Sequence, residues 1–245
     1  MYIIKGIVHP ERAPISLGPL KFSIHHPTTK NNAEINFNIV LNQITLLIDT
    51  SNEWNIYDLK NMAKQLVADH LAIIGFIKGY AYEVEIRQIL NPEKEIDQVY
   101  GIDIPCIEKR NKKMKISHDF PKIMAHIQGE LGLYVKRCLN DLIASMKYPD
   151  DTGFYCYRAI ESLKQYCKEK FNISKEADQW KKFREITGYK KDDIDIVKNF
   201  ADPVRHGDVI NMTSENREKI FLKTWDIIEG FFDNIEKATD IFQNS

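Results

Sequence analysis

The dominant period of the apolar residues changes close to residue 105. Before this point short runs alternate between apolar and polar residues, as in INFNIVL at residues 35–41, which is typical of a half-buried β-strand. After residue 116 apolar residues recur every three or four positions, which is typical of amphipathic helices. The sequence therefore predicts a β-rich domain over residues 1–105 and a helical domain over residues 116–245.

The N-terminal domain is expected to have an α+β fold. Asn42-Gln43 separates two β-type runs, as expected for a tight hairpin. One helix, from near Asn55 to about Gly79, interrupts the strands, because apolar residues recur there at helical spacing. The strands are expected at residues 1–8, 20–25, 33–41, 44–49 and 80–90. This order predicts a mostly antiparallel sheet, or a partial barrel, with one long helix packed on it.

Composition and charge limit the kinds of partner. Hydrophobic residues make up 43% of the chain and charged residues 28%, a balance typical of globular proteins. The net charge of −1 gives no overall basic field, so any contact with nucleic acid must be local. The first residues lack a signal-peptide pattern, and the longest apolar run is too short to cross a bilayer. We therefore expect a soluble, cytoplasmic protein with no membrane partner.

A basic stretch separates the two predicted domains. The sequence EKRNKKMK, from Glu108 to Lys115, holds five basic residues in eight and has no apolar period. Such a run is typical of a solvated connector, so residues 106–115 are predicted to be a basic linker. A strip that contacts phosphate groups is the alternative.

The helical domain is predicted to be an up-and-down bundle. Its third helix is expected to end at Gly188, as a C-cap, and its fourth before Pro203, because the residue ahead of a proline avoids helical geometry. Two long antiparallel helices, two short ones and a long closing helix are expected near residues 131–146, 152–171, 177–188, 190–202 and 213–241.

Several chemistries lack the residues they require. The seven histidines and four cysteines are dispersed, without the spacing of a zinc site. The chain has no dinucleotide fingerprint, no phosphate-binding P-loop and no GxSxG elbow. Cys156 falls in a helical apolar pattern, which indicates a core thiol and not a nucleophile. We therefore expect neither a metal nor a cofactor.

Three stretches of the helical half carry a resemblance to a known superfamily. They are FYCYRAIESLKQYC at residues 154–167, KNFADPVRHGD at residues 198–208 and EKIFLKTWDIIEGFFDNI at residues 218–235. They resemble the HEPN superfamily, over about Phe120 to Phe242. The resemblance implies a compact helical bundle and a homodimer whose two copies build one site. Many members are metal-independent endoribonucleases, in which a histidine transfers protons at the ribose 2′-OH and an upstream arginine, followed by a polar residue, steadies the phosphate.

The resemblance places the candidate catalytic residues in KNFADPVRHGD. His206 takes the position of the proton-transferring histidine, and Lys198-Asn199 takes that of the arginine and its polar neighbour. Seven residues separate Lys198 from His206, more than in the family, and lysine lacks the forked donor of arginine, so Arg205 is a second candidate for the phosphate. The alternative is that Arg205 and His206 only connect two helices, with Gly207 permitting a positive φ.

Polar residues on neighbouring helices are candidates for binding. Arg158 and Glu161 lie mid-helix, and an ion pair, such as Glu161 with Arg205, is the alternative to a role in the site. On the short third helix an aromatic ring for stacking on a base precedes a basic cluster, and the alternative is a solvated helix face. This second set consists of Trp180, Lys181, Lys182 and Arg184.

Two functions follow from these candidates. The first is an RNA-cleaving effector of a prokaryotic toxin or phage-defence system, with a trigger sensed by the β-rich domain. The second is a non-catalytic dimerisation scaffold whose β-rich domain binds a partner protein or nucleic acid. A small-molecule or nucleotide-binding module is a third hypothesis, supported by the superfamily name alone. The apolar residues of the first and last bundle helices exceed one narrow stripe, which also predicts a homodimer.

Overall fold

The computed structural model describes residues 1–25, 32–101, 103–210 and 212–243. The chain forms two compact units, Met1–Asp103 (unit 1) and Ile104–Ser245 (unit 2). Each unit has its own core of buried apolar side chains.

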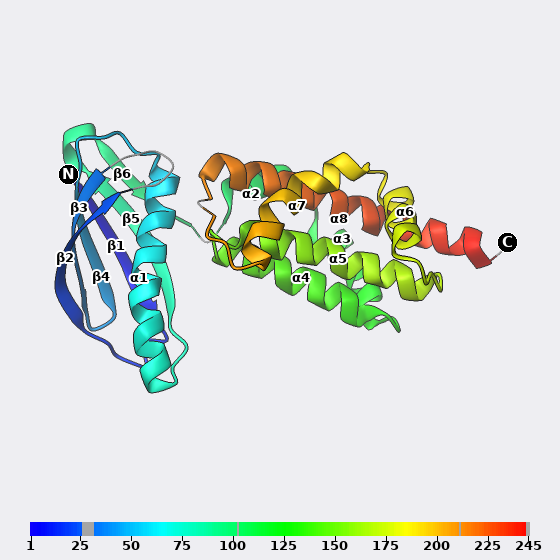
Figure 1. Ribbon diagram of the computed structural model, residues 1–245, viewed down its shortest axis with the longest axis horizontal. Coiled ribbons are helices and arrows are strands. Elements are labelled where there is room, and N and C mark those ends of the chain that lie inside the picture. The colour runs from blue at the N-terminus through cyan, green and yellow to red at the C-terminus, as the bar shows by residue number, and fades with distance from the viewer. Residues whose placement is uncertain (26–31, 102, 211, 244–245) are drawn as a thin grey trace. The chain divides into compact units, whose positions relative to one another are not determined.

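Unit 1 contains a six-stranded sheet in which neighbouring strands run antiparallel, in the order β2-β3-β4-β1-β5-β6 (Figure 1). The expected antiparallel sheet is thus confirmed, as an open sheet with β2 and β6 at its edges among the described residues. The short β6 was not expected, and a 3₁₀ turn at Pro92–Lys94 leads into it. The strands are β1 (Tyr2–His9), β2 (Leu17–His25), β3 (Asn32–Val40), β4 (Gln43–Asp49), β5 (Glu83–Asn91) and β6 (Ile96–Val99).

The hairpin between β3 and β4 confirms the predicted tight turn, one residue earlier than expected. Val40 pairs with Gln43, so Leu41 and Asn42 are the two turn residues, with φ of 45° and 69°. Two consecutive positive φ values are typical of the turn type that matches strand twist. The connection between the strands expected at residues 20–25 and 33–41 falls mostly on residues 26–31, outside the described residues.

Helix α1 (Ile56–Lys78) lies across the sheet, as predicted (Figure 1). The Asn55 side chain accepts hydrogen bonds from the backbone N–H groups of Tyr57 and Asp58, at 2.9 and 3.4 Å, which fixes the first turn. Gly79 ends the helix in the left-handed conformation, with φ of 68°. The residues of α1 that are buried in the core of unit 1 are Leu59, Ala63, Val67 and Leu71.

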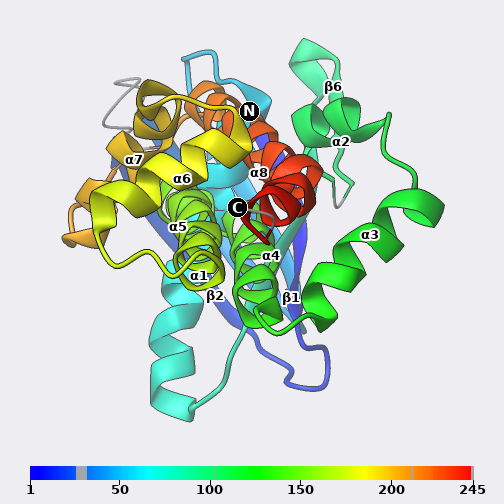
Figure 2. The same ribbon diagram turned by 90° about the vertical axis from the view of Figure 1, so that its right-hand side faces the viewer.

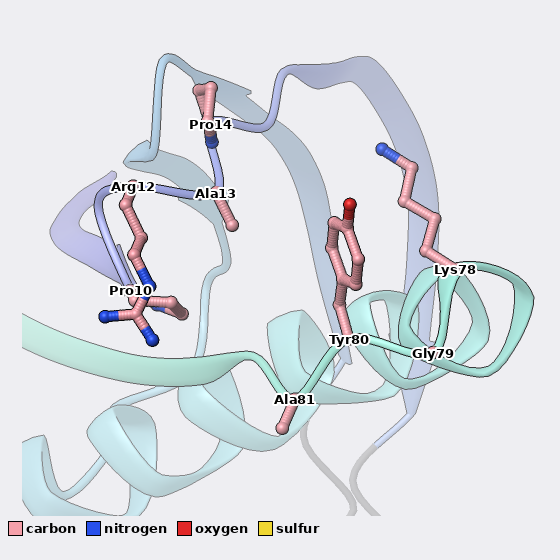
Figure 3. Close-up of a pocket in the computed structure, with 8 residues that line it drawn as sticks. All are labelled: Pro10, Arg12, Ala13, Pro14, Lys78, Gly79, Tyr80 and Ala81. Carbon is pink, nitrogen blue, oxygen red and sulfur yellow. The ribbon is translucent and has the colours of Figure 1, made fainter.

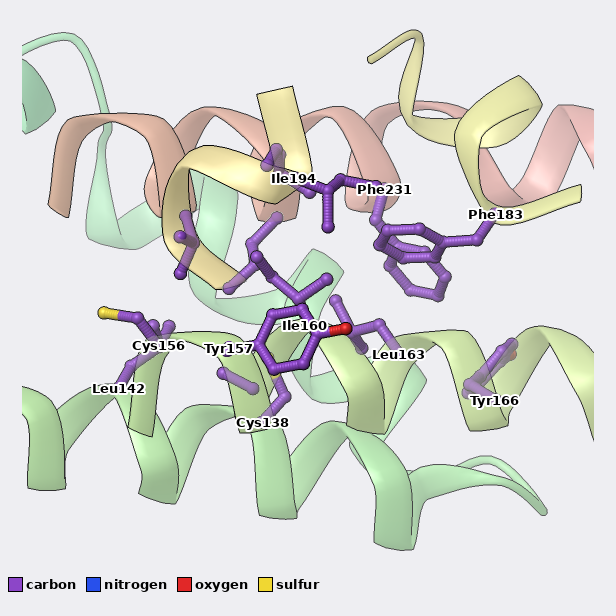
Figure 4. Close-up of a cluster of buried hydrophobic side chains, with 14 of the residues drawn as sticks. Cys138, Leu142, Cys156, Tyr157, Ile160, Leu163, Tyr166, Phe183, Ile194 and Phe231 are labelled. Carbon is purple, nitrogen blue, oxygen red and sulfur yellow. The ribbon is translucent and has the colours of Figure 1, made fainter. Parts of the chain in front are cut away.

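Unit 2 is helical, as predicted (Figures 1 and 2). Helix α5 packs against α4, α6, α7 and α8. Buried residues from all five helices meet in one core, among them Cys138, Ile160, Phe183, Ile194 and Phe231 (Figure 4). The helices of unit 2 are α2 (Pro105–Asn111), α3 (Ile116–Gln128), α4 (Gly132–Lys147), α5 (Thr152–Lys170), α6 (Glu176–Thr187), α7 (Lys191–Arg205) and α8 (Ser214–Gln243).

The segment expected to be a basic linker, residues 106–115, is largely helical. Ile107 of α2 is buried in the core of unit 2. The Arg110 guanidinium contacts Asp226 and Glu229 of α8, at 2.6 and 2.5 Å. These contacts with a distant segment, and not a local apolar period, hold the basic stretch against the unit.

Helix α7 does not stop before Pro203 but continues to Arg205. The ring of a proline removes one helical N–H and disfavours helical geometry in the residue before it. Here the proline lies in the last turn, so only one hydrogen bond of α7 is lost. The next helix, α8, begins after Thr213, whose hydroxyl accepts the Asn216 N–H at 3.3 Å and so caps the first turn.

Candidate functional site

The end of α7 forms a rigid corner that presents Arg205 and His206. Gly207 has a φ of 88°, and its N–H donates to the Val204 carbonyl at 3.1 Å. The Asp208 N–H donates to the Pro203 carbonyl at 2.9 Å. This pair of hydrogen bonds around a left-handed glycine is a Schellman motif, which satisfies the last carbonyls of the helix. The glycine exit predicted from the sequence is therefore present.

His206 is the C-cap residue of α7, and its side chain is exposed. Its backbone N–H donates to the carbonyls of Asp202 and Pro203, at 3.2 and 3.0 Å. Within the described part of the chain, the imidazole has no hydrogen-bond or ion-pair partner. The backbone of His206 is thus held firmly while its ring is accessible from solvent.

Arg205 lies beside Glu161 of α5. The Arg205 Nη1 is 3.6 Å from the Glu161 Oε1, with half of the arginine side chain exposed. The ion pair weighed from the sequence is therefore present, in a loose and partly solvated form. Pairs of this kind contribute about 1 kcal/mol or less, so another anion can compete for the guanidinium.

Lys198 and Asn199 lie two turns before the corner on α7. The Lys198 Nζ is 3.7 Å from the Asp202 Oδ2, a pair four residues apart in which both side chains are partly exposed. Asn199 is exposed. Because each residue of a helix rises by about 1.5 Å, Lys198 and Arg205 are separated by roughly 10 Å along the axis. The structure therefore places both cations on one helix, each beside a carboxylate.

Asp202 and Tyr157 lie close to Glu161 and Arg205, and neither was singled out as a site residue from the sequence. Tyr157 is buried in the core of unit 2 (Figure 4). Burial raises the pKa of its hydroxyl well above the usual value, and the negative charges of Glu161 and Asp202 raise it further. The spacing of four residues between Lys198 and Asp202 was the available signal for this carboxylate.

Arg158 faces α4 and not the α7 corner. Its guanidinium makes two hydrogen bonds to the buried carboxylate of Asp141, one of them from Nε to Oδ2 at 2.9 Å. It also lies over the rings of Phe154 and Tyr155, about 5 Å from each centroid. These contacts join α4 to α5, so the geometry supports a structural role for Arg158.

Trp180 of α6 is partly buried and packed within unit 2. Its ring stacks on Tyr157, with centroids 6.2 Å apart and an angle of 18° between the planes. The ammonium of Lys164 lies 5.1 Å from the centroid of the same ring. Stacking of Trp180 on a base would have to displace these contacts, so the geometry favours the structural alternative.

The basic residues that follow Trp180 do not form one site. The Lys182 ammonium lies over the Phe171 ring, 4.6 Å from its centroid, whereas Lys181 is exposed. The Arg184 carbonyl accepts the N–H of Gly188, which has the left-handed C-cap conformation predicted for it. Lys181 therefore remains open to solvent, while Lys182 is held against the body of unit 2.

Neither a group of metal ligands nor a membrane-spanning helix occurs among the described residues. Within residues 1–25, 32–101, 103–210 and 212–243, no three His, Cys, Asp or Glu side chains come together as metal ligands would. Over the same described ranges, each helix is too short or too polar to cross a membrane.

Comparison with known families covers both units. Residues 2–100 match the family described as Domain of unknown function (DUF8168) N-terminal domain. Residues 120–236 match the corresponding C-terminal domain of the same family. Neither a curated protein nor a solved structure matches the chain.

Proposed function

We propose that this protein, which belongs to the DUF8168 family, is a metal-independent endoribonuclease that acts at the corner formed by Arg205 and His206. The observation that carries the proposal is the exposed His206 imidazole, which has no partner among the described residues and extends from a rigid helix end. Arg205 lies at the same end of α7, and half of its side chain is exposed. A base and a phosphate ligand are the groups that RNA cleavage without a metal requires.

The reaction uses the RNA itself as the nucleophile. Neutral His206 accepts the proton of a ribose 2′-OH, and the 2′-oxygen attacks the adjacent phosphorus. The bond from phosphorus to the 5′-oxygen breaks, which leaves a 2′,3′-cyclic phosphate on one fragment. The leaving 5′-oxygen takes a proton from the protonated imidazolium of His206 in a second copy, in the dimer implied by the HEPN resemblance, so that one imidazole gains a proton and the other loses one. Because the 2′-OH is tethered beside the phosphorus, positioning supplies much of the rate.

Arg205 is proposed to hold the phosphate in this reaction. A guanidinium offers two parallel N–H donors to phosphate oxygens, which a lysine cannot. Glu161 would orient Arg205 before RNA binds. The phosphate would then replace Glu161 as the partner of Arg205, because the 3.6 Å between Arg205 Nη1 and Glu161 Oε1 is longer than a hydrogen bond. Lys198 and Asn199 would contact the RNA further along α7.

The test is cleavage of a defined RNA by purified protein in EDTA. We expect fragments with 2′,3′-cyclic phosphate ends, and loss of at least a hundredfold in rate in His206→Ala, in line with the usual contribution of a general base. The matched control is His118→Ala, because His118 is an exposed histidine of α3. Intact RNA at high protein concentration, or equal loss of rate in both variants, would contradict the proposal.

A second function, the non-catalytic scaffold, is favoured by a different observation. The cations of the corner are already beside carboxylates, Arg205 with Glu161 and Lys198 with Asp202. Negative charge repels an RNA backbone, so this surface would suit a protein partner better. In this case light scattering detects a dimer, and His206→Ala and the wild type leave RNA equally intact.

The proposed setting is a prokaryotic toxin or phage-defence system. Its only support is the HEPN resemblance of the helical half. Growth of a bacterial host that expresses the wild type or His206→Ala tests this setting, because an RNA-cleaving toxin arrests growth only when His206 is present.

A further inference from the structure

A hollow of about 600 Å³ opens in unit 1 between the chain at residues 10–14 and the end of α1 (Figure 3). This volume falls in the range of small-molecule sites. Proline and alanine side chains form part of its wall, and three long polar side chains complete it. These three are Arg12, Lys78 and Tyr80.

Arg12 and Lys78 differ from the cations of the α7 corner. Both are exposed, and neither has a carboxylate within ion-pair distance in the parts of the chain that the structure describes. An incoming anion therefore does not have to displace a carboxylate of the described residues from either cation. Exposed cations without an internal partner are the groups that a phosphate backbone contacts most readily.

The position of Tyr80 is fixed by the end of α1. The Tyr80 N–H donates to the Gly75 carbonyl at 3.1 Å, after Gly79 reverses the chain. Gly75 leaves no room for a Cβ, which would lie 2.6 Å from the Tyr80 carbonyl oxygen. About half of the Tyr80 side chain is nevertheless exposed, and its ring meets Tyr82 edge to face. A held but exposed aromatic ring is a surface on which a base can stack.

The arrangement of the three side chains selects one kind of ligand. In Figure 3 the Tyr80 ring stands between Arg12 on one side and Lys78 on the other, and the Lys78 ammonium is 5.9 Å from the ring centroid. A strand of nucleic acid carries a phosphate on either side of each base. A mononucleotide has its phosphate on one side only, and an acidic peptide has charges but no base to stack.

We propose that this hollow binds single-stranded nucleic acid, with a base stacked on Tyr80 and the flanking phosphates on Arg12 and Lys78. Phe76, with 90% of its side chain exposed one turn before Gly79, supplies a second ring near the same helix end. Unit 1 as a whole has more acidic than basic side chains, so binding depends on these local cations and weakens with salt. The site goes beyond the proposed cleavage, since binding here does not require His206.

The test measures binding with a protein that does not cut. Full-length His206→Ala is titrated into a fluorescein-labelled twelve-nucleotide oligouridylate, and binding is followed by fluorescence anisotropy. When Tyr80→Ala is introduced into the His206→Ala protein, binding is expected to weaken about tenfold or more. Tyr80→Phe in the same background keeps the ring and is expected to keep the affinity. Arg12→Ala and Lys78→Ala are each expected to reduce the dependence of log affinity on log salt by about 0.7, one phosphate contact on a single strand. The matched control, Lys21→Ala, removes an exposed lysine of β2 and leaves affinity unchanged.

Three results would overturn the proposal. The first is that the protein does not bind oligouridylate at low salt, and the second is that affinity is equal with and without the Tyr80 ring. The third is that poly-L-glutamate or uridine monophosphate competes at the same concentration as unlabelled oligouridylate. Melting curves of each variant verify folding, and the charge variants test the site even if Tyr80→Ala unfolds. Cleavage by the wild type is a separate measurement, so failure of this site and failure of the proposed ribonuclease are distinguishable.

Discussion

Gly153, in the first turn of α5, has no room for a side chain. A Cβ at this position would lie 2.7 Å from the Cβ of Phe200 and 2.8 Å from its carbonyl carbon and oxygen. Phe200 belongs to α7, the helix that carries Lys198, Arg205 and His206. The substitution Gly153→Ala therefore forces α7 away from α5, and with it the candidate site.

Two opposing effects set the size of the change. Carbon atoms that are not bonded pack at about 3.5–4.0 Å, so the helices must separate by roughly 1 Å to accept the methyl group. Overpacking costs about 1–3 kcal/mol, and because two of the three close atoms here belong to the Phe200 backbone and not to a flexible side chain, we expect about 2–3 kcal/mol. Alanine is favoured over glycine in a helix by about 1 kcal/mol, which offsets part of this cost. We expect a net loss of about 1–2 kcal/mol, or a fall in Tm of roughly 2–8 °C for a unit of this size.

Thermal unfolding followed by circular dichroism measures this loss directly. The matched control is Asn140→Ala, an alanine introduced at an exposed position of α4, which is expected to change stability by less than about 0.5 kcal/mol. If Gly153→Ala leaves Tm unchanged or raises it, helix propensity outweighs packing, and the close approach of α5 and α7 is refuted. RNA cleavage by the variant should fall as well, because Glu161 of α5 and Arg205 of α7 move apart.

Three further predictions concern other parts of the two units. The Asp193 carboxylate accepts hydrogen bonds from Lys223 and from the backbone at the start of α7, which lowers its pKa. Asp193→Asn should therefore lower the free energy of unfolding, measured with urea at neutral pH, by up to about 1 kcal/mol. The difference between wild type and variant shrinks as pH falls below the ordinary aspartate pKa, and it vanishes below the lowered pKa. Burial raises the pKa of Cys156 to about 11. Iodoacetamide at pH 8 should therefore label this thiol only after unfolding, which mass spectrometry would detect. Asn42 is buried in the β3–β4 turn with φ of 69°, and its side chain accepts the Ile15 N–H at 2.7 Å. Asn42→Ala should therefore lower the free energy of unfolding in urea by about 2–3 kcal/mol. Asn42→Gly should lower it less, because glycine tolerates this φ.

Helix α1 shows which parts of the fold local sequence determines. Asn55 can cap only the N–H groups that follow it, and Gly79 can adopt the left-handed conformation without a Cβ clash. Both signals act within a few residues, so the bounds of the helix were predictable from the sequence. The hairpin at Asn42 was predictable for the same reason, apart from a shift of one residue.

The two errors in the helical unit have different causes, and the first depends on distant contacts. The basic stretch at residues 106–115 has no helical apolar period, but Arg110 reaches Asp226 and Glu229 more than a hundred residues later. A pattern read over a short window does not contain such contacts. The error at Pro203 has a local cause, because the Schellman motif around Gly207 closes the last turn of α7 beyond the proline.

The two candidate sites also depend on the fold, because cations that lie close together in the sequence are not always available to a ligand. Lys198 and Arg205 are close together in the sequence, yet each has a carboxylate within 4 Å in the folded unit. Arg12 and Lys78 are far apart in the sequence, and the fold of unit 1 alone brings both to the sides of Tyr80. If both proposals hold, the affinity for RNA lies mainly in unit 1 and the chemistry in unit 2. In that case Lys78→Ala raises the KM for a long RNA and leaves kcat unchanged, whereas His206→Ala lowers kcat and leaves binding intact.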